Sequence, residues 1–390
     1  MKKIAISIDE YIFETGGKYY GDNVGFDIVK RYADNFEQVR MIARIKHVDS
    51  NHLDMHNILL PWNNIEYCNV PFFNSMSGLV KNYKDISGQI TEAIKGCDIA
   101  LVRSPSLVGF LTLRKIGDLM PYALEVVANP YEMYKGYSGM QKIQSLIMHF
   151  IQKHFCKNAI GIAFVTKKSQ QKIYEINKKK DNNTHYSSIE LRRDFFYEKP
   201  FDHINVTDTA KTLIISHVAN MIVGNLKGHK EVLQVAASLQ KKGRKVKVMF
   251  AGDGPDVDYY KELAEKNDVD SQFLGFIDKN QLRELLQKSD FFLFPSKSEG
   301  LPKVLIEAMA VSLPCIASNV GGIPELLPTS SIFDSYDVDG MAQRILELAS
   351  NKQKYMDNAC LMYNTALEYE SSVLALRREA FYRRLTEFAQ

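Results

Sequence analysis

The segment 291–309, FFLFPSKSEGLPKVLIEAM, constrains the fold more than any other part of this chain. It opens with four apolar residues bounded by a proline, which is typical of a short strand buried on both faces. Pro295 and Gly300 then indicate a loop. Pro302 suits the first position of a helix, because its missing N–H costs nothing there. This order predicts a loop at the carboxyl end of a parallel strand, where α/β proteins bind ligands.

Two carboxylates flank this loop, because Glu299 lies in it and Glu307 follows one to two turns into the helix. The free N–H groups near residues 300–303 and the positive end of the helix dipole attract anions. A sugar joined to a diphosphate needs both kinds of group, N–H donors for the phosphates and carboxylates for the hydroxyls. Two glutamates eight residues apart are, by themselves, more often solvated surface side chains.

The letters SEGLPKVLIEAMA resemble the acidic segment of retaining nucleotide-sugar glycosyltransferases with the GT-B fold, the group 1 or family 4 enzymes. In that family the first Glu faces the donor sugar and the second holds the ribose of the nucleotide. The resemblance implies these roles for Glu299 and Glu307, and donor contacts for Gly300, Leu301 and Pro302. It is specific because E-G-x-P and E-A-M-A occur together at the right spacing.

Composition agrees with a soluble globular enzyme, and 390 residues suffice for two domains. We expect no membrane-spanning helix, since no run reaches about 18 apolar residues. The N-terminal apolar run is cut short by Asp9 and Glu10 and predicts a first strand, not a secretory signal. Five scattered cysteines without a C-x-x-C pair favour reduced thiols in the cytoplasm and argue against structural zinc.

The first half of the chain alternates strand-like and helix-like segments, which predicts right-handed βαβ units and a mainly parallel sheet. The segment ETGGKYYGDN, 14–23, is predicted to be a loop. The predicted strands are 3–9, 38–45, 97–104, 122–128 and 159–166, and the predicted helices are 78–96, 106–117 and 139–155.

The second half repeats the alternation after a polar stretch at 182–208, where we place the linker. The GT-B resemblance implies two Rossmann-like doubly wound domains facing across a cleft. We assign 1–205 to the acceptor-side domain and 206–373 to the nucleotide-sugar-binding domain, with 374–390 crossing back to the first. The predicted strands are 211–218, 245–252, 272–277, 291–294 and 314–318, and the predicted helices are 230–243, 257–267, 280–289, 340–350 and 371–390.

Lys227 stands just before a predicted helix, in the letters NLKGHKEV. In the family, a Lys here and an Arg after the preceding strand neutralise the diphosphate. Lys227 matches the Lys, but the letters SHV stand where the family has G-R-L, so His217 takes the place of the Arg. A His is cationic only if its pKa is held up, and it lacks the bidentate fork of Arg. This departure leaves weaker donor binding or loss of activity open.

Other donor contacts follow from the resemblance. A glycine pair after the first strand, Gly16 and Gly17, would touch the donor phosphate and the acceptor, although two glycines by themselves more often form a plain surface turn. Gly252 opens the G-D-G-P turn, and the backbone around Phe276 matches the place where the family holds the base. The family has G-G-x-x-E at NVGGIPE, which implies that Glu325 shapes the donor pocket.

The segment 133–180 carries ten lysines and one acid, although the whole chain has a net charge of only +3. Its plain interpretation is an amphipathic helix packed on the sheet; the alternative is a peripheral contact with an anionic membrane that carries a lipid-linked acceptor. The letters YALEVVANPYEMY resemble bacterial polysaccharide-assembly members of the family. We therefore place Glu125, Asn129 and Tyr131 on the acceptor side of the cleft, and we add Lys18, a possible cation beside the glycine pair.

The sequence therefore predicts a retaining hexosyltransferase that moves a sugar from a nucleotide-diphosphate sugar to a saccharide, in cell-surface polysaccharide or lipopolysaccharide synthesis. Glu299, Lys227 and His217 are its candidate catalytic residues. No catalytic metal, cofactor or nucleic acid is expected, because no D-x-D directly ends an apolar strand and a helix terminus with basic residues can bind the phosphates. An epimerase or hydrolase of the same fold and a non-catalytic partner subunit remain open, while the missing G-x-G-x-x-G argues against an NAD dehydrogenase.

Overall fold

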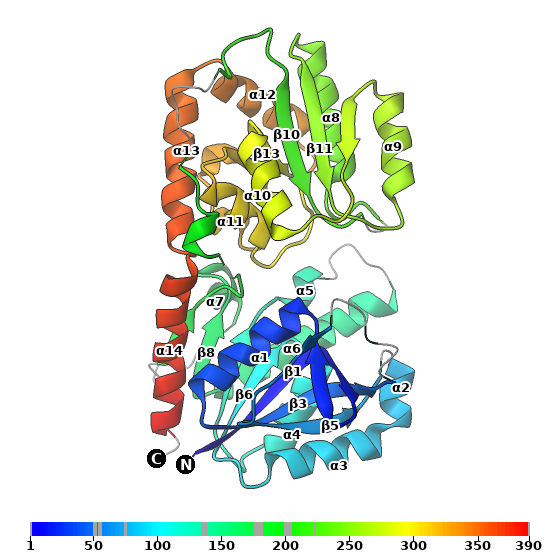
Figure 1. The fold of residues 1–390 in the computed structure, drawn as a ribbon, viewed down its shortest axis with the longest axis vertical. Coiled ribbons are helices and arrows are strands. Elements are labelled where there is room, and N and C mark those ends of the chain that lie inside the picture. Colours follow the sequence, from blue (N-terminus) through cyan, green and yellow to red (C-terminus); the bar gives the residue numbers. More distant parts are fainter. Residues whose placement is uncertain are drawn as a thin grey trace.

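The computed structural model describes residues 2–49, 53, 57–73, 76–133, 139–174, 182–189, 191–198, 205–221 and 224–388. Two α/β domains lie one above the other, and helices α13 (Lys352–Leu367) and α14 (Ser371–Phe388) run along one side of both (Figure 1). Each domain contains one mainly parallel sheet with helices on its faces. The predicted class of two Rossmann-like domains is confirmed.

The sheet of the first domain is built on β1, whose residues 4–8 are fully buried because helices cover both faces. Its parallel strands follow the order β5-β3-β1-β6-β7-β8-β9. They are β1 (Lys3–Thr15), β3 (Gln38–His47), β5 (Ile65–Pro71), β6 (Ile99–Ser104), β7 (Tyr122–Val126), β8 (Gly161–Phe164) and β9 (Asn183–His185).

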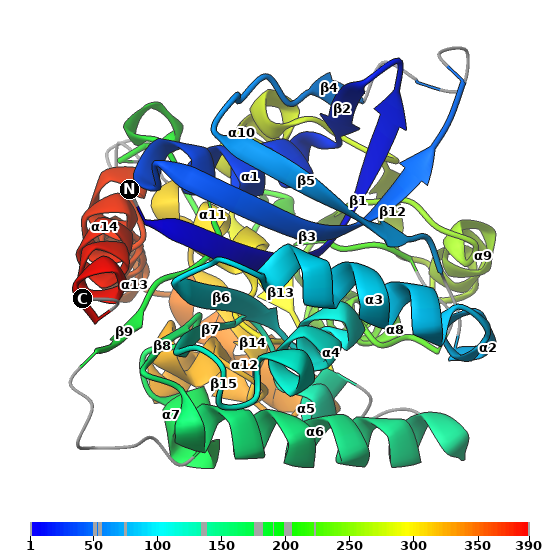
Figure 2. The ribbon, with the colours of Figure 1, turned by 90° about the horizontal axis from the view of Figure 1, so that it is seen from below.

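Helices of the first domain cover both faces of this sheet. The longest, α6 (Met140–Asn158), lies on the outside of the domain (Figure 2). The others are α1 (Asn23–Asn35), α2 (Met76–Lys81), α3 (Tyr83–Ile94), α4 (Leu107–Ile116), α5 (Pro130–Met133) and α7 (Ser169–Ile173).

The segment predicted as a loop at 14–23 is mostly a β-hairpin. Strand β1 continues to Thr15, and β2 (Lys18–Gly21) returns antiparallel to it and also pairs with β4 (Ile58–Leu59). The two-residue turn between them needs positive φ at both positions, and Gly16 and Gly17 supply it with φ of 57° and 76°. The alternating aromatic and β-branched residues of 11–20 were the signal for these strands.

The second sheet is wholly parallel, in the order β12-β11-β10-β13-β14-β15, so the strand order reverses between β10 and β13. This reversal makes the crevice at their carboxyl ends the expected ligand site. The strands are β10 (Leu213–Val218), β11 (Val246–Ala251), β12 (Asp270–Phe273), β13 (Phe291–Phe294), β14 (Cys315–Ser318) and β15 (Ile332–Phe333). The helices are α8 (His229–Lys241), α9 (Val257–Lys266), α10 (Lys279–Lys288), α11 (Lys303–Ala310) and α12 (Val338–Ala349).

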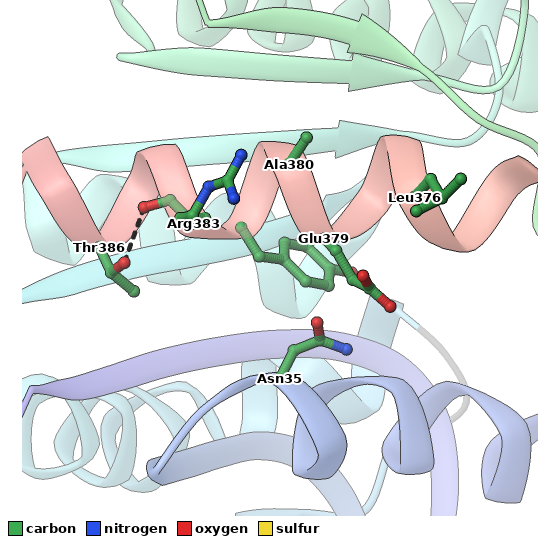
Figure 3. A pocket seen from close by; sticks show the side chains of 7 residues that line it. Asn35, Leu376, Glu379, Ala380, Arg383 and Thr386 are labelled. Carbon is green, nitrogen blue, oxygen red and sulfur yellow. Dashed lines mark hydrogen bonds between the residues drawn. The ribbon is translucent and has the colours of Figure 1, made fainter.

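Helix α14 returns to the first domain, where it contacts β8 and β9. It buries Leu374, Phe381, Tyr382 and Leu385 there. A shallow cavity of about 440 Å³ separates its exposed residues from Asn35 at the end of α1 (Figure 3). Strand β9 pairs within the first sheet and β10 belongs to the second, so the chain crosses between the domains at residues 186–212 and again between α13 and α14.

A buried carboxylate ties α14 to the first domain. Glu125 on β7 is 4% exposed. It accepts hydrogen bonds from the phenols of Tyr382 (2.6 Å), Tyr186 (2.7 Å) and Tyr32 (2.7 Å), and Arg103 lies at 3.5 Å. Burial alone would raise the pKa of Glu125, but Arg103 and the three phenols hold it below its usual range. The prediction that Glu125 contacts the acceptor is therefore wrong, since it is a structural anchor.

We expect Tyr382→Phe to lower the free energy of unfolding by about 2 kcal/mol, because Glu125 loses a charge-assisted hydrogen bond inside the protein. Thermal unfolding monitored by scanning calorimetry, together with proteolysis of the C-terminal helix, measures the effect. Tyr336→Phe is the control, since that ring is 67% exposed. Equal stability of wild type and Tyr382→Phe would contradict the anchoring role.

Candidate active site

The segment that opened the sequence analysis forms the predicted strand, loop and helix. Strand β13 ends at Phe294 and α11 begins at Lys303. Pro302 precedes the helix as an extended residue with φ −72° and ψ 115°, one position earlier than expected. Glu299, Gly300 and Leu301 are half-buried in the loop, so the free N–H groups of α11 open at the switch point of the sheet.

Lys227 and Glu299, 72 residues apart, meet at this loop. The Lys227 Nζ lies 2.6 Å from the Glu299 Oε1, and the Ser296 hydroxyl donates to the same oxygen at 2.7 Å. Both side chains are largely covered, with 27% of Lys227 and 11% of Glu299 exposed. The structure thus brings together the two residues that were predicted to contact the diphosphate and the sugar.

Close backbone contacts hold this loop in place. A Cβ on Gly228 would lie 2.3 Å from the Pro295 carbonyl oxygen, and one on Gly321 would lie 2.0 Å from the Glu299 carbonyl oxygen. The Gly322 N–H also donates to the Gly300 carbonyl at 2.6 Å. Only glycine allows such an approach, so the turns before α8 and after β14 fix the position of Glu299.

Gly252 supports the site from the neighbouring strand. Its φ is 125°, and a Cβ there would lie 2.1 Å from the Ala219 carbonyl oxygen in the loop after β10. Its N–H donates to the Gly275 carbonyl at 2.8 Å, which places Phe276 directly beside it with 81% of its surface exposed. Contact of either residue with a nucleotide stays a prediction.

The prediction that His217 supplies positive charge is wrong. Its side chain is fully buried, and its ring packs against His229, Phe250 and Phe294. The Nδ1 lies 2.8 Å from the Leu293 carbonyl oxygen, so this nitrogen must carry the proton. Burial and the nearby His229 lower the pKa of His217 well below its usual range. The side chain is therefore a neutral core residue.

Cations from both domains gather instead near the start of α11. Burial lowers the pKa of Lys303, and the positive charges of Arg31 and Arg103 in the first domain lower it further. Glu307 and Glu10 oppose this shift. Each of these four groups therefore lies within electrostatic reach of Lys303. The sequence analysis missed Lys303, Arg31, Arg103 and Glu10; the position of Lys303 directly after Pro302 was the available signal.

Glu307 lies on α11, one to two turns into the helix as predicted, and its side chain is half-buried. Burial raises its pKa, and Lys279 and Lys303 oppose that shift. A carboxylate in such surroundings is ready to accept hydrogen bonds from a diol. Its contact with a ribose stays a prediction.

Glu325 does not face this loop. Its carboxylate accepts hydrogen bonds from the backbone N–H groups of Lys167, Lys168 and Ser169, at the start of α7 in the first domain. A carboxylate at a helix start satisfies free N–H groups and interacts favourably with the helix dipole. The expectation that Glu325 shapes the donor pocket is therefore wrong, and Glu325 instead joins the two domains.

The glycine pair of the first domain forms the turn of the β1–β2 hairpin. The Gly17 N–H donates to Glu14, which pairs with His47, so the turn is held within the hairpin. Earlier in β1, burial raises the pKa of Glu10, and Arg103 and, more weakly, Lys303 of the second domain oppose this shift. Contact of Gly16 and Gly17 with the donor stays a prediction.

Of the remaining acceptor-side predictions, Asn129 is a structural residue. It is 5% exposed, and its Oδ1 accepts from the Tyr174 hydroxyl at 3.0 Å and the Tyr131 N–H at 3.1 Å. Tyr131 is 43% exposed, and Ser298 of the second domain donates to the carbonyl of the next residue, Glu132, at 2.5 Å. Contacts of Tyr131 and of the exposed Lys18 with an acceptor stay predictions.

The basic region 133–180 is only partly described, and Lys135 and 178–180 lie outside the described residues. Helix α6 carries Lys142, Lys153 and Lys157 together with the exposed Ile143, Ile147 and Phe150. None of the helices in the described part of the chain is long and apolar enough to span a bilayer. A membrane contact of this region stays a prediction.

Two facing Rossmann-like domains, a terminal helix that returns to the first, and a helix start at the switch point of the second are typical of the GT-B class of glycosyltransferases. Residues 207–359 match the family Glycosyl transferases group 1. This match covers the second domain, and together with glycosyltransferase relatives and structural neighbours it supports a GT-B glycosyltransferase of group 1 that acts in polysaccharide or glycoconjugate biosynthesis.

Individual proteins agree with this assignment. The chain is 27% identical to Protein CapJ of Staphylococcus aureus over 368 residues, which cover 93% of this chain and 90% of CapJ. Its fold is similar to that of a sucrose-phosphate synthase from Thermosynechococcus elongatus, with a TM-score of 0.71, 16% identity and full coverage of both chains. It is also similar to Alr3699/HepE of Anabaena, solved in complex with UDP-glucose, with a TM-score of 0.61, 14% identity and coverage of 100% and 99%.

The buried histidines predict acid lability of the second domain. Burial lowers the pKa of His229 to about 4, and that of His217 falls as well. The unfolded chain therefore binds more protons than the folded one, so stability is fully present above about pH 6.5 and is lost as the pH falls toward 4. The loss from His229 alone is on the order of 3 kcal/mol.

Midpoints of thermal unfolding between pH 7 and pH 4 measure this loss. We expect His229→Phe to flatten the pH dependence, because it keeps the aromatic packing and removes the titrating group. His154→Gln on the surface of α6 serves as the control and should keep the wild-type slope. An unchanged slope in His229→Phe would refute the assignment.

The contact of Glu325 with α7 predicts a second effect. We expect Glu325→Ala to raise the fraction of molecules with separated domains, because three N–H groups lose their common acceptor. Small-angle X-ray scattering reports this as a larger radius of gyration. Glu368→Ala is the matched control, since it removes only an exposed ion pair with Lys167. Identical scattering of both variants would argue against the joining role.

Proposed function

We propose that this glycosyltransferase is a retaining enzyme that transfers a hexose from a nucleotide-diphosphate sugar to a saccharide acceptor carried by a lipid. The second domain holds the donor and the first domain holds the acceptor. The observation that carries the proposal is the meeting of Lys227 and Glu299 beside the start of α11 at the sheet switch point. The UDP and UDP-glucose complexes of Alr3699/HepE support a nucleotide-sugar donor.

The reaction needs negative charge to be stabilised where it develops, on the departing diphosphate. Lys227, Lys303 and the free N–H groups at Gly300 and Leu301 provide this stabilisation in our proposal. Arg31 and Arg103 add positive potential from the first domain. With this set of charges, a catalytic metal has no necessary role, and we propose a metal-independent reaction.

In the transfer step, the bond between the anomeric carbon and the phosphate oxygen breaks while the acceptor oxygen attacks the same face of the sugar. The acceptor hydroxyl proton passes to the departing phosphate oxygen, so no separate general base is required. Glu299 orients the sugar hydroxyls, and Glu307 holds the ribose. Binding of the diphosphate draws Lys227 away from Glu299 and frees that carboxylate for the sugar.

Two alternatives were weighed from the sequence. A non-catalytic subunit was suggested by the lack of a phosphate-binding Arg at position 217; in our proposal, Lys227 and Lys303 supply the positive charge instead. An epimerase or hydrolase would release product without an acceptor.

The proposals of a lipid-borne acceptor and of a peripheral position on the inner face of the plasma membrane rest on the basic rim of α6.

Thermal shift with a panel of UDP-, GDP- and ADP-sugars tests donor binding and identifies the base. Product analysis by NMR with the selected donor and saccharide acceptors then gives the anomeric configuration and the effect of EDTA. Absence of any stabilisation by the panel would refute the donor site. An inverted product, or activity lost with EDTA and restored by a divalent ion, would refute the proposed mechanism.

We expect Glu299→Ala and Glu307→Ala to act on different steps. Glu299→Ala should lower kcat about 100-fold with little change in donor Kd, because its contacts strengthen as the sugar becomes charged. Glu307→Ala should weaken donor binding about tenfold, as the loss of a hydrogen-bonding carboxylate implies. Steady-state kinetics and calorimetric titration with donor separate the two. Glu347→Ala, remote on α12, is the control, and wild-type turnover in Glu299→Ala would contradict the site.

A further inference from the structure

An apolar groove runs between α4 and α6 on the outside of the first domain. Helix α4 presents Leu107, Phe110, Leu111 and Arg114 to it, at the spacing of one helix face. Helix α6 presents a matching face that includes Ile147 and Ile151. The groove has a volume of about 850 Å³, and most of its lining is apolar. Its depth between two helices distinguishes it from a flat hydrophobic surface.

The charged groups that line this groove are two arginines and one aspartate, besides His154. The Arg44 guanidinium lines its inner part beside Asp9, at 2.7 Å, and Arg114 and His154 line it from α4 and α6. Lys153 stands on α6 directly before His154. An occupant with a long apolar part and a negative charge would match this lining.

The groove is connected to the proposed active site through β1. The register of β1 against β3 shifts between Ser7 and Tyr11, and Asp9 of this irregular segment lines the groove. The next residue, Glu10, responds electrostatically to Lys303 across the domain cleft. Since neighbouring side chains of an extended chain point to opposite sides, the inner end of the groove lies one residue from the cleft.

We propose that this groove binds the hydrocarbon chain of a phosphate-bearing lipid, the carrier of the acceptor saccharide. The proposal rests on the proposed function and adds to it the site of the lipid. The chain lies between α4 and α6, the phosphate is met by the arginines of the groove, and the saccharide extends into the cleft beside Glu10. Such a site holds one lipid molecule, whereas the exposed apolar side chains of α6 outside the groove can only touch a bilayer.

Dodecyl phosphate below its micelle concentration is the probe, and calorimetric titration is the measurement. We expect saturable binding of one molecule, and at least tenfold weaker binding of inorganic phosphate and of dodecyl maltoside. Inorganic phosphate binding as tightly as dodecyl phosphate would overturn the proposal, because the chain would then contribute nothing.

The helix α6 offers a matched pair of variants. Ile143 and Ile147 lie one turn apart, each is 53% exposed, and only Ile147 lines the groove. We expect Ile147→Gln to weaken dodecyl phosphate binding about tenfold and Ile143→Gln to leave it unchanged. Equal loss in both variants would point to a flat membrane-contact surface, and no loss in Ile147→Gln would exclude the groove; either result refutes the proposal.

Donor binding separates this test from that of the proposed function. Both isoleucine variants should be stabilised by the selected nucleotide sugar as the wild type is, because the groove lies in the other domain. A protein that binds donor but not dodecyl phosphate disproves the lipid site alone. A protein that binds dodecyl phosphate but no nucleotide sugar disproves the proposed function and leaves the groove.

Discussion

The ion pair between Lys227 and Glu299 depends on backbone contacts that only glycine permits. Gly228 brings the turn before α8 against Pro295, and Gly321 brings the turn after β14 against Glu299. Three loops of the second sheet thus converge at the start of α11, with their charged side chains already placed. Because the site is assembled from backbone contacts, its geometry is stiff before any ligand arrives. The charges contributed by the first domain then depend on how the two domains are joined.

Three acidic residues join the domains or support the cleft without entering the chemistry. Glu125 gathers three phenols and Arg103, and thereby connects α14 to the strand that carries a cleft cation. Glu325 accepts from the N–H groups at the start of α7. Glu10 lies opposite Lys303. In a chain with nearly balanced charge, a carboxylate takes a structural role where it is buried among hydrogen-bond donors or lies at the start of a helix.

The two-domain architecture was predictable because alternating apolar strands and helices occur throughout both halves, and the letters around Glu299 and Lys227 are specific. The roles of His217 and Glu325 were not predictable, because motif position says nothing about burial. The aromatic pocket around His217 and the helix that Glu325 caps are formed by residues far away in the sequence. The hairpin around Gly16 and Gly17 was missed for another reason: a hairpin turn and a phosphate-binding loop require the same backbone freedom. Lys303 and Arg103 gain importance only when the two domains face each other.

The link between α13 and α14 is three residues long, 368–370, and it pairs with the other crossing of the chain through Leu191 and Glu370. Helix α14 is fixed to the first domain by Tyr382, while α13 packs on α11 in the second. Both connections between the domains therefore pass through one point. A rotation about that point swings the start of α11 away from Glu10 and Arg103 without deforming either sheet. The positive potential beside Lys227 and Lys303 therefore depends on how far the two domains are closed.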